Sequence, residues 1–485
     1  MEIIVSKINS NKNISDGKII MAFEGENPLE ETNYPIKNEE FNGKFLEIKT
    51  LNLALEEKPN KIIFIGLGKR DEINHEKIRK AIGKSIKESN KLNIKNIEVS
   101  TIGIDKILTL NEFSKIISET AILANYKFDK YLSNKNKTKL EKLNIVCNED
   151  DYDEINKSIN EGKTLGEATN LARNLVNEPS NILTPIKLSE EVDKAGKEYG
   201  FDVEVYDEKE IKKFGMEAYL EVSKGSINPP RFIVMKYFGD KDNEENIVGL
   251  VGKGLTYDSG GLSLKPNSGM VNMKTDMAGS AAVIGAIAAI AKMELKINVI
   301  GAIAACENMI SSKAYKPGDI INTMAGKTIL VNNTDAEGRL TLVDGVYYLV
   351  EKENVNKILD IATLTGAAQR AFGNHVTAVL SNDDTFYREL EKATEESGEM
   401  IARAPILDEY RKLIKPDIAD LTNSSKGPGM ITAGIFISEF VKGKPWIHMD
   451  IAGTSWSEEE LEYIPKGGTG VGVRTIYYLL KENSN

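Results

Sequence analysis

The stretch IVGLVGKGLTYDSGG at residues 247–261 determines the fold class that the sequence predicts. Its first six residues are apolar or glycine, as in strands that are buried on both faces of a sheet. Two more stretches of this kind lie at 297–305 and 357–363. Helical patterns accompany them at 277–293, 340–353 and 432–441. Strands that alternate with helices predict an α/β domain with a single thick core.

The first 150 residues contain a shorter series of the same type. Strand-like runs at 61–68, 96–100 and 144–147 alternate with helical stretches rich in lysine and glutamate, which predicts a smaller α/β domain. A long helical pattern over 155–176 follows and stops before Pro179. We therefore predict an N-terminal domain over 1–150, a linker helix over 151–178 and a C-terminal domain over 179–485.

The composition excludes several classes of protein. The chain has 485 residues, of which 41% are hydrophobic and 28% charged, so it is globular rather than disordered. Its net charge of −11 disfavours a dedicated nucleic-acid binder. No apolar run reaches the roughly 18 residues that a membrane helix needs. Two cysteines and no recognisable targeting segment lead us to expect a soluble cytoplasmic protein.

Polar residues gather directly after the strand at 247–252. Lys253 follows it, at the end of a strand where open α/β sheets bind ligands. Gly254, Gly260 and Gly261 allow tight turns that return Asp258 toward Lys253. Asp276 directly precedes the apolar helix at 277–293, so its alternative role is that of a helix N-cap.

A second polar stretch, KTILVNNTDAEGRL, occupies residues 327–340. Asp335, Glu337 and Arg339 are spaced by two, so they project to one side if the segment is extended. Carboxylates held that close repel each other unless a cation or a shared proton intervenes. The segment from Asn333 to Asp344 also resembles an EF-hand loop, but Asn at its first place and a preceding strand argue against calcium binding of that kind.

The two stretches together offer a carboxylate-rich metal site. Four acids, Asp258, Asp276, Asp335 and Glu337, suffice for two divalent ions bridged by shared oxygens. The chain has only three histidines, so such a site must depend on carboxylates. Lys253 in the same cluster could ligate a metal only after losing its proton, which burial and adjacent cations favour.

The sequence also resembles a known family. NTDAEGRL at 333–340, together with VGKGLTYDSGG at 251–261, resembles the cytosolic leucyl aminopeptidases, a family of dinuclear metallopeptidases. Further matching segments extend the likeness over about residues 165 to 476. The resemblance implies two α/β domains: a smaller, macro-like N-terminal domain and a larger C-terminal catalytic domain, zinc-exopeptidase-like, with a mixed central sheet.

The resemblance assigns roles residue by residue. Lys253 and Asp276 bind the tighter metal, Asp335 binds the more exchangeable one, and Asp258 and Glu337 bridge the two. Lys265 and Arg339 are the catalytic side chains outside the metal shell. Arg339 also holds a bicarbonate ion, with backbone around Leu364 and Gly366. The pocket for the first side chain is implied to contain Met273, Asn333, Ala336 and Thr363.

The activity implied is release of N-terminal residues, leucine and other apolar ones preferred, from peptides with a free amine. The cofactors implied are two divalent ions per subunit, zinc or manganese with cobalt or magnesium as alternatives, and bicarbonate. The family assembles as homohexamers. We read His375, His448 and Cys306 as structural. The rival readings are an accessory DNA-binding role, another dinuclear hydrolase such as a phosphatase, and an inactive scaffold. The net negative charge argues against DNA binding, the scarcity of histidines argues against a phosphatase, and the intact ligand positions argue against an inactive scaffold.

Overall fold

The computed structural model describes residues 1–8, 15–26, 41–52, 61–101, 108–134 and 140–482. The chain divides into two compact units. Unit 1 comprises residues 1–170 and 459–466, and unit 2 comprises 171–458 and 467–485. The division falls inside helix α3 (Tyr152–Asn177), which covers the helical pattern predicted at 155–176. The division after residue 170 thus lies within the linker helix predicted over 151–178. The sequence analysis did not predict that residues 459–466 belong to unit 1.

Unit 1 contains a six-stranded sheet in the order β1-β6-β5-β2-β4-β3. All neighbours are parallel except the β3–β4 pair. The strands are β1 (Glu2–Lys7), β2 (Gly17–Phe23), β3 (Ile48–Asn52), β4 (Lys61–Gly68), β5 (Asn96–Ser100) and β6 (Lys142–Cys147). Helices α1 (His75–Lys91) and α2 (Leu110–Ala124) pack on each other beside it, after the short helix η1 (Arg70–Glu72). This is the largely parallel α/β domain that the sequence predicted.

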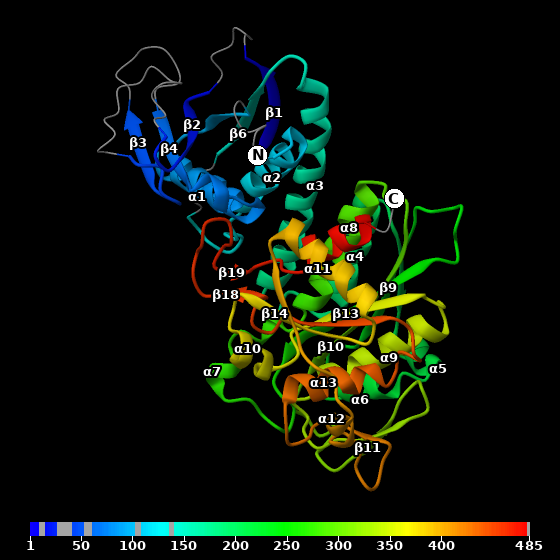
Figure 1. Cartoon of the computed structure of the whole chain (residues 1–485). Helices are drawn as coiled ribbons and strands as arrows, with labels where there is room; N and C mark the ends of the chain where they lie inside the picture. Colours follow the sequence, from blue (N-terminus) through cyan, green and yellow to red (C-terminus); the bar gives the residue numbers. More distant parts are fainter. Residues whose placement is uncertain (9–14, 27–40, 53–60, 102–107, 135–139, 483–485) are drawn as a thin grey trace. The chain divides into compact units, whose positions relative to one another are not determined.

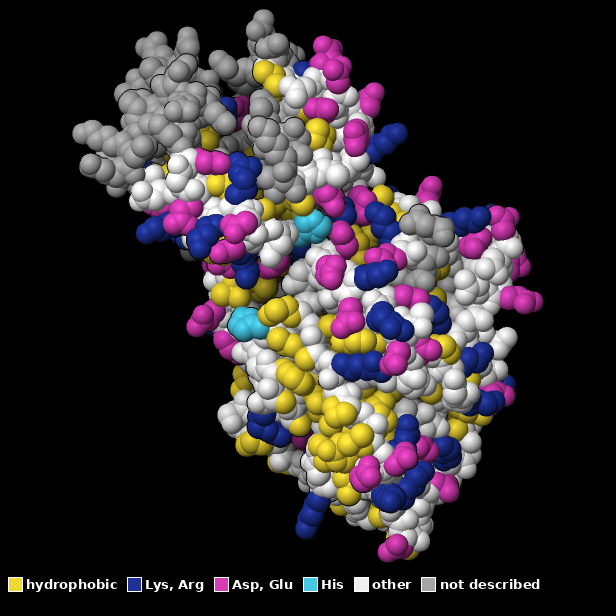
Figure 2. Space-filling model, in the orientation of Figure 1, with side chains coloured by type: hydrophobic (Ala, Val, Ile, Leu, Met, Phe, Trp, Pro, Cys, Tyr) yellow, Lys and Arg dark blue, Asp and Glu magenta, His cyan; other side chains and the backbone are white. Residues whose placement is uncertain are grey.

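The lysines of unit 1 alternate with acids in the structure as they do in the sequence. Along α1, Lys77 pairs with Glu72 at 3.0 Å and Lys91 with Glu88 at 3.3 Å. Figure 2 shows Lys and Arg side chains interspersed with Asp and Glu across the visible face of unit 2 as well. On that face the charge is mixed rather than gathered by sign.

Unit 2 is built on an eight-stranded mixed sheet in the order β15-β14-β17-β13-β9-β10-β8-β7. The central strands β17, β13, β9 and β10 run parallel, and β14, β8 and β7 introduce antiparallel pairs. The strands are β7 (Asp202–Tyr206), β8 (Arg231–Phe238), β9 (Ile247–Asp258), β10 (Asn298–Asn308), β13 (Lys357–Ala362), β14 (Val376–Ser381), β15 (Met400–Arg403) and β17 (Trp446–Asp450). The mixed central sheet is thereby confirmed.

Two layers of helices cover the faces of this sheet (Figure 1). One layer contains α4 (Pro185–Tyr199), α8 (Ala278–Lys292), α11 (Asp384–Ser397) and α14 (Val473–Glu482). The other contains α6 (Glu217–Ser223), α9 (Gly338–Glu351) and α13 (Gly429–Ser438). The remaining elements are α5 (Glu208–Phe214), α7 (Asn267–Met270), η2 (Met273–Thr275), α10 (Gly366–Phe372), α12 (Asp408–Lys412), β11 (Ile320–Asn322), β12 (Thr328–Leu330), β16 (Leu421–Thr422), β18 (Trp456–Ser457) and β19 (Gly467–Gly468).

Helix α8 lies wholly inside the core of unit 2. One helical stretch of the described chain, 267–292, is long and apolar enough to cross a membrane, but 89% of its most apolar window is buried within the structure. The sequence predicted a buried helix at 277–293, and α8 begins one residue later.

Strand β9 differs from its prediction in a way that shapes the site. We expected it to end near Gly252, but it continues to Asp258 because β10 pairs with it along its whole length. Its pairing with β13, in contrast, ends at Gly252. The prediction that Lys253 follows the strand is therefore wrong. Lys253 lies within β9, at the point where β9 and β13 separate.

Candidate metal centre

Because β13 separates from β9 at Lys253, acidic side chains lie beside this lysine where β13 would otherwise continue. The Lys253 side chain is 3% exposed, and its Nζ lies 2.7 Å from Asp276 Oδ1 and 2.9 Å from Glu337 Oε1. It also donates to the Thr363 carbonyl oxygen at 3.0 Å. Close approach of helix α9 is possible because residue 338 is glycine, where a Cβ atom would stand 2.3 Å from Lys253 Cε.

Asp258 closes β9 and is held from three directions. Its Oδ1 accepts hydrogen bonds from Gly260 N and Asn308 Nδ2, both at 2.8 Å, and its Oδ2 lies 2.8 Å from Lys265 Nζ. The turn that follows needs glycine, since Gly260 and Gly261 have φ of 85° and 63°. The prediction that Gly254 joins this turn is wrong, because residue 254 pairs with Ala305 within β9 and β10.

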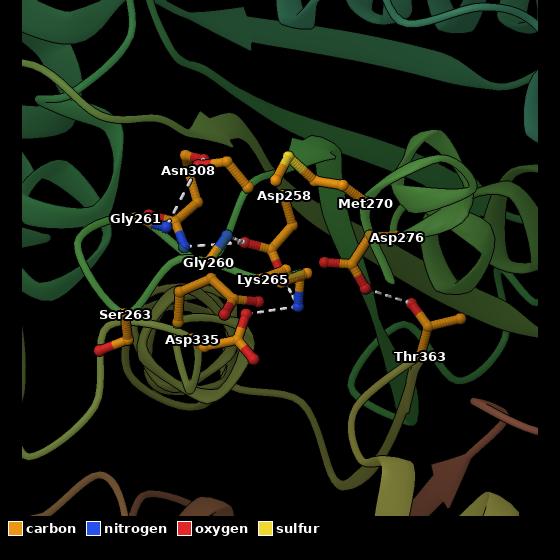
Figure 3. Close-up of polar contacts among 12 residues, drawn as sticks. Asp258, Gly260, Gly261, Ser263, Lys265, Met270, Asp276, Asn308, Asp335 and Thr363 are labelled. Atoms are coloured by element: carbon orange, nitrogen blue, oxygen red, sulfur yellow. Dashed lines mark hydrogen bonds and ion pairs between the residues drawn. The ribbon is translucent and has the colours of Figure 1, made fainter. Parts of the chain in front are cut away.

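Asp276 contacts the cluster and is not the N-cap of helix α8. Met277 occupies the N-cap position of α8, and that helix has no side-chain cap, so the alternative role of Asp276 is wrong. Asp276 Oδ1 accepts from Lys253 Nζ and, at 2.8 Å, from Thr363 Oγ1. Its Oδ2 is buried and has no hydrogen-bond partner within the residues that the structure describes. Figure 3 shows this carboxylate facing the group formed by Asp258 and Lys265.

The segment that carries Asp335 and Glu337 is a turn, not an extended strand. The Asn333 side chain accepts a hydrogen bond from Asp335 N at 2.8 Å, and Glu337 has helical dihedrals at the start of α9. The predicted extended geometry is therefore wrong, yet carboxylate oxygens of Asp258, Asp335 and Glu337 lie within 4.8 Å of one another. Lys265 Nζ pairs with Asp335 Oδ1 in this group (Figure 3).

The EF-hand alternative is excluded by the position of Asp344. This buried carboxylate accepts from the backbone N–H groups of Tyr219 and Met324 at 3.0 and 2.9 Å. It thus joins the start of α6 to the β11–β12 turn instead of closing a loop around an ion. Burial raises the pKa of Asp344 to about 7.

Four acids face only two ammonium groups in this cluster, so negative charge is in surplus. Burial alone would lower the pKa values of Lys253 and Lys265, but the surrounding carboxylates outweigh it and hold both lysines protonated. Burial, together with the charge of Asp258, raises the pKa values of Asp276, Asp335 and Glu337. A surplus of buried negative charge is stabilised by added cations. The residues therefore fit divalent metal ions.

Arg339 lies next to the cluster and fits an anion. The side chain is buried, and burial lowers the pKa of the guanidinium to about 10. Its Nε has no hydrogen-bond partner among the described residues, so a donor remains for a bound anion. Of the backbone groups predicted to assist, Leu364 N donates to Asp450 Oδ1 at 3.2 Å, while Gly366 begins helix α10.

The residues expected to line the substrate pocket surround the cluster. Met273 begins η2 three residues before Asp276, and Asn333 and Ala336 flank Asp335. Thr363 follows β13 directly. All four are half-buried, and two have side-chain contacts to the acids: Thr363 Oγ1 donates to Asp276 Oδ1, and Asn333 Oδ1 accepts from Asp335 N.

The structural reading of His448 agrees with its surroundings. His448 is fully buried, and its Nδ1 lies 2.6 Å from Asp360 Oδ1. Trp446 Nε1 donates to the other oxygen of Asp360 at 2.6 Å. Cys306 is a free, buried cysteine of β10, and His375 is exposed before β14.

Sequence reasoning missed two buried asparagines that hold the acidic loops. Asn308 contacts Asp258 and Thr334, and Asn423 receives and donates hydrogen bonds along residues 332–336. Both amides belong to segments more than 20 residues distant from the loops they contact. The available signal was their type, since asparagine is depleted in strands and rarely buried.

Comparison with known proteins places the chain among the peptidases. The family model described as "Cytosol aminopeptidase family, catalytic domain" matches residues 170–477, and the model of the same family's N-terminal domain matches 30–135. The chain belongs to the cytosol aminopeptidase family. It is accordingly an enzyme, a hydrolase that releases N-terminal residues from peptides.

Individual relatives agree with this assignment. The chain is 50% identical to a probable cytosol aminopeptidase of Clostridium perfringens over 480 residues, 96% of each chain. It is 42% identical to one of Alkaliphilus oremlandii, with 99% of each chain covered. Among solved structures it is similar to the bottromycin maturation enzyme BotP in complex with Mn, with 29% identity, a TM-score of 0.87 and coverage of 97% of this chain and 100% of that one.

Proposed function

We propose that this aminopeptidase depends on two divalent metal ions held by Lys253, Asp258, Asp276, Asp335 and Glu337. The observation that carries the proposal is a pair of buried carboxylate oxygens, Asp276 Oδ2 and Glu337 Oε2, for which the described part of the chain supplies no hydrogen-bond partner. Buried carboxylate oxygens normally have partners, and a cation is the partner that this cluster lacks. The manganese complex of the similar BotP enzyme supports the same assignment.

The two ions differ in how exposed their ligands are. The Asp276 side chain is 6% exposed and that of Asp335 33% exposed. This difference supports a tight ion that Lys253 and Asp276 would hold and a more exchangeable ion that Asp335 would hold. Asp258 and Glu337, which offer oxygens within 4.8 Å of an Asp335 oxygen, would be ligands shared by both ions. Carboxylate ligands suit zinc and manganese, with cobalt and magnesium as alternatives.

When bound, the ions supply a water of lowered pKa and polarise the substrate carbonyl. The residues of the chain perform the other steps. Lys253 would serve as a ligand only as the neutral amine, and the proton that it holds in the metal-free cluster would pass to solvent. Lys265 places an ammonium group where negative charge develops on the carbonyl oxygen. Arg339 stays protonated and holds a bicarbonate ion through its free Nε, with Gly366 N as a second donor.

The substrates we propose are peptides with a free N-terminus and an apolar first residue such as leucine. The half-buried Met273 and Ala336, together with Asn333 and Thr363, supply a partly apolar margin for that side chain. The resemblance of the sequence to the family supports a homohexamer, and the names of the relatives support a cytoplasmic location.

Hydrolysis of leucine p-nitroanilide tests the proposal directly. We expect cleavage with added Mn²⁺, no cleavage of the N-acetylated substrate, and loss of activity with a chelator. Glu337→Ala is expected to abolish turnover. Glu351→Ala, at the exposed end of the same helix, is the matched control because Glu351 is exposed and forms an ion pair with Lys442 at 2.9 Å. Full activity of metal-stripped enzyme, or of Glu337→Ala, would contradict metal dependence. A panel of amino-acid p-nitroanilides that differ in their first residue tests the apolar preference. Analytical ultracentrifugation, which measures the mass of the assembly, tests the hexamer.

A further inference from the structure

Asn308 is the last residue of β10 and lies at the back of the metal centre (Figure 3). Its side chain is fully buried. Its Nδ2 donates to Asp258 Oδ1 at 2.8 Å and to the carbonyl oxygen of Thr334 at 2.9 Å. One amide group thus joins the two loops that carry the acids, since Thr334 directly precedes Asp335.

The contacts determine which way this amide points. Two acceptors face Nδ2, so an NH₂ group must occupy that place. Asn308 Oδ1 points instead toward Gly261 and Thr334, and a Cβ atom at Gly261 would stand 2.9 Å from it. Glycine at 261 therefore leaves room for the orientation in which both protons of the amide are used.

The consequence falls on Asp258. Its Oδ1 already accepts two hydrogen bonds, from Asn308 and from Gly260 N, whereas Oδ2 contacts Lys265. The carboxylate is thereby fixed in plane and presents one oxygen, Oδ2, to the centre of the cluster. The same amide holds Thr334, and with it the turn to Asp335, at a set distance from Asp258.

We propose that Asn308 is a positioning residue of the metal centre: it orients Asp258 for coordination through Oδ2 and fixes the spacing between Asp258 and Asp335. This inference rests on the proposed dinuclear function. Partners of metal-ligating carboxylates typically contribute 10–100-fold to metal affinity. Loss of the Asn308 amide weakens metal binding by that factor.

Asn298 provides a matched control at the other end of the same strand. It too is fully buried, and its Nδ2 donates to two carbonyl oxygens, those of Asp240 and Asn243, both at 3.0 Å. Ten residues of strand separate the two amides, a distance of about 33 Å. The Asn298 Oδ1 also accepts from Asp240 N at 3.0 Å, so Asn298→Ala removes three hydrogen bonds from the same strand, against two for Asn308→Ala, without touching an acid of the cluster.

The experiment titrates metal-stripped wild type, Asn308→Ala and Asn298→Ala with Mn²⁺ by calorimetry, and measures leucine p-nitroanilide hydrolysis against Mn²⁺ concentration. We expect Asn308→Ala to bind Mn²⁺ about 10–100-fold more weakly and to need a correspondingly higher concentration for half-maximal activity. Its KM for the substrate remains that of the wild type. Asn298→Ala binds Mn²⁺ as the wild type does, although both variants lose stability in urea.

The outcomes separate this inference from the function on which it rests. If wild type binds no Mn²⁺, the proposed function fails. If wild type binds Mn²⁺ and Asn308→Ala binds it within threefold as well, the positioning role fails. An equal loss in Asn298→Ala also overturns it, because the effect is then one of general stability. If Asn308→Ala is partly unfolded, the rise of its unfolding midpoint with Mn²⁺ reports the affinity of the folded fraction.

Discussion

Replacement of Gly338 by alanine tests how closely the fold confines Lys253. Gly338 begins α9, and an added Cβ would stand 2.3 Å from Lys253 Cε, 2.7 Å from Nζ and 2.9 Å from Cδ. Carbon atoms in contact prefer separations of about 3.5–4.0 Å. The end of the lysine must therefore move by at least about 1.2 Å.

The cost of this movement falls on the site and not on the fold. Gly338 does not have a positive φ, and alanine in a helix is favoured over glycine by up to about 1 kcal/mol. Lys253 Nζ, however, makes contacts of 2.7, 2.9 and 3.0 Å that cannot all survive the shift. Misplacement by 1 Å costs on the order of 100-fold in rate, about 2.7 kcal/mol in the activation barrier.

The assay compares kcat for leucine p-nitroanilide, Mn²⁺ affinity and unfolding in urea. We expect Gly338→Ala to lose about 100-fold in kcat while its free energy of unfolding without metal stays within about 1 kcal/mol of wild type. Gly345→Ala on the same helix is the control, since its Cβ would meet the side chains of Val251, at 3.3 Å, and Phe232, at 4.0 Å, and not Lys253. A folded Gly338→Ala enzyme with kcat within threefold of wild type would refute the reasoning.

Three further predictions concern charges in unit 2. Lys265→Met removes the ammonium group that pairs with Asp335, so Mn²⁺ should bind about tenfold more tightly while turnover falls. Unchanged or weaker Mn²⁺ binding, measured by calorimetry, contradicts this prediction. Asp344, with its pKa raised to about 7, stays protonated in the folded chain while the unfolded chain ionises from about pH 4. The contribution of Asp344 to the free energy of unfolding therefore falls by up to about 4 kcal/mol as the pH rises from about 4 to 7. The loss of unfolding free energy caused by Asp344→Asn, measured in urea, should shrink over the same range. A loss that stays constant with pH contradicts this prediction. Asp360→Ala leaves His448 without its buried partner and should cost about 3–5 kcal/mol of unfolding free energy, whereas a loss below about 1 kcal/mol would show that the pair is dispensable.

The sequence predicted those parts of the fold that depend on local pattern. Buried strands and the apolar helix α8 follow from runs of one residue class, and their positions agree with the structure. The end of β9 was predicted wrongly because pairing with β10 is a tertiary property. Lys253 interrupts the apolar pattern, yet it pairs with Ala304 of β10 and so remains in the sheet.

The site shows the same limit. Asp276 before an apolar helix has the pattern of an N-cap, but its carboxylate accepts hydrogen bonds from Lys253, inside β9, and from Thr363, directly after β13. Asp335 and Glu337 meet because of a turn closed by the Asn333 side chain, not because of alternation. The contacts of Asn308 and Asn423 depend on which segments become neighbours in space, and no local pattern states that.

The separation of β9 from β13 after Gly252 also bears on how this enzyme could be altered by directed evolution. Lys253 and Asp258 stand on one rigid strand, and glycines at 252 and 338 bring backbone within contact of it on both sides. Random substitution of these two glycines would mostly yield inactive clones, since a side chain at 252 would displace main chain and a side chain at 338 would displace Lys253. A library aimed at new substrates should leave this strand untouched and vary the half-buried positions at its margin, such as Met273 and Ala336.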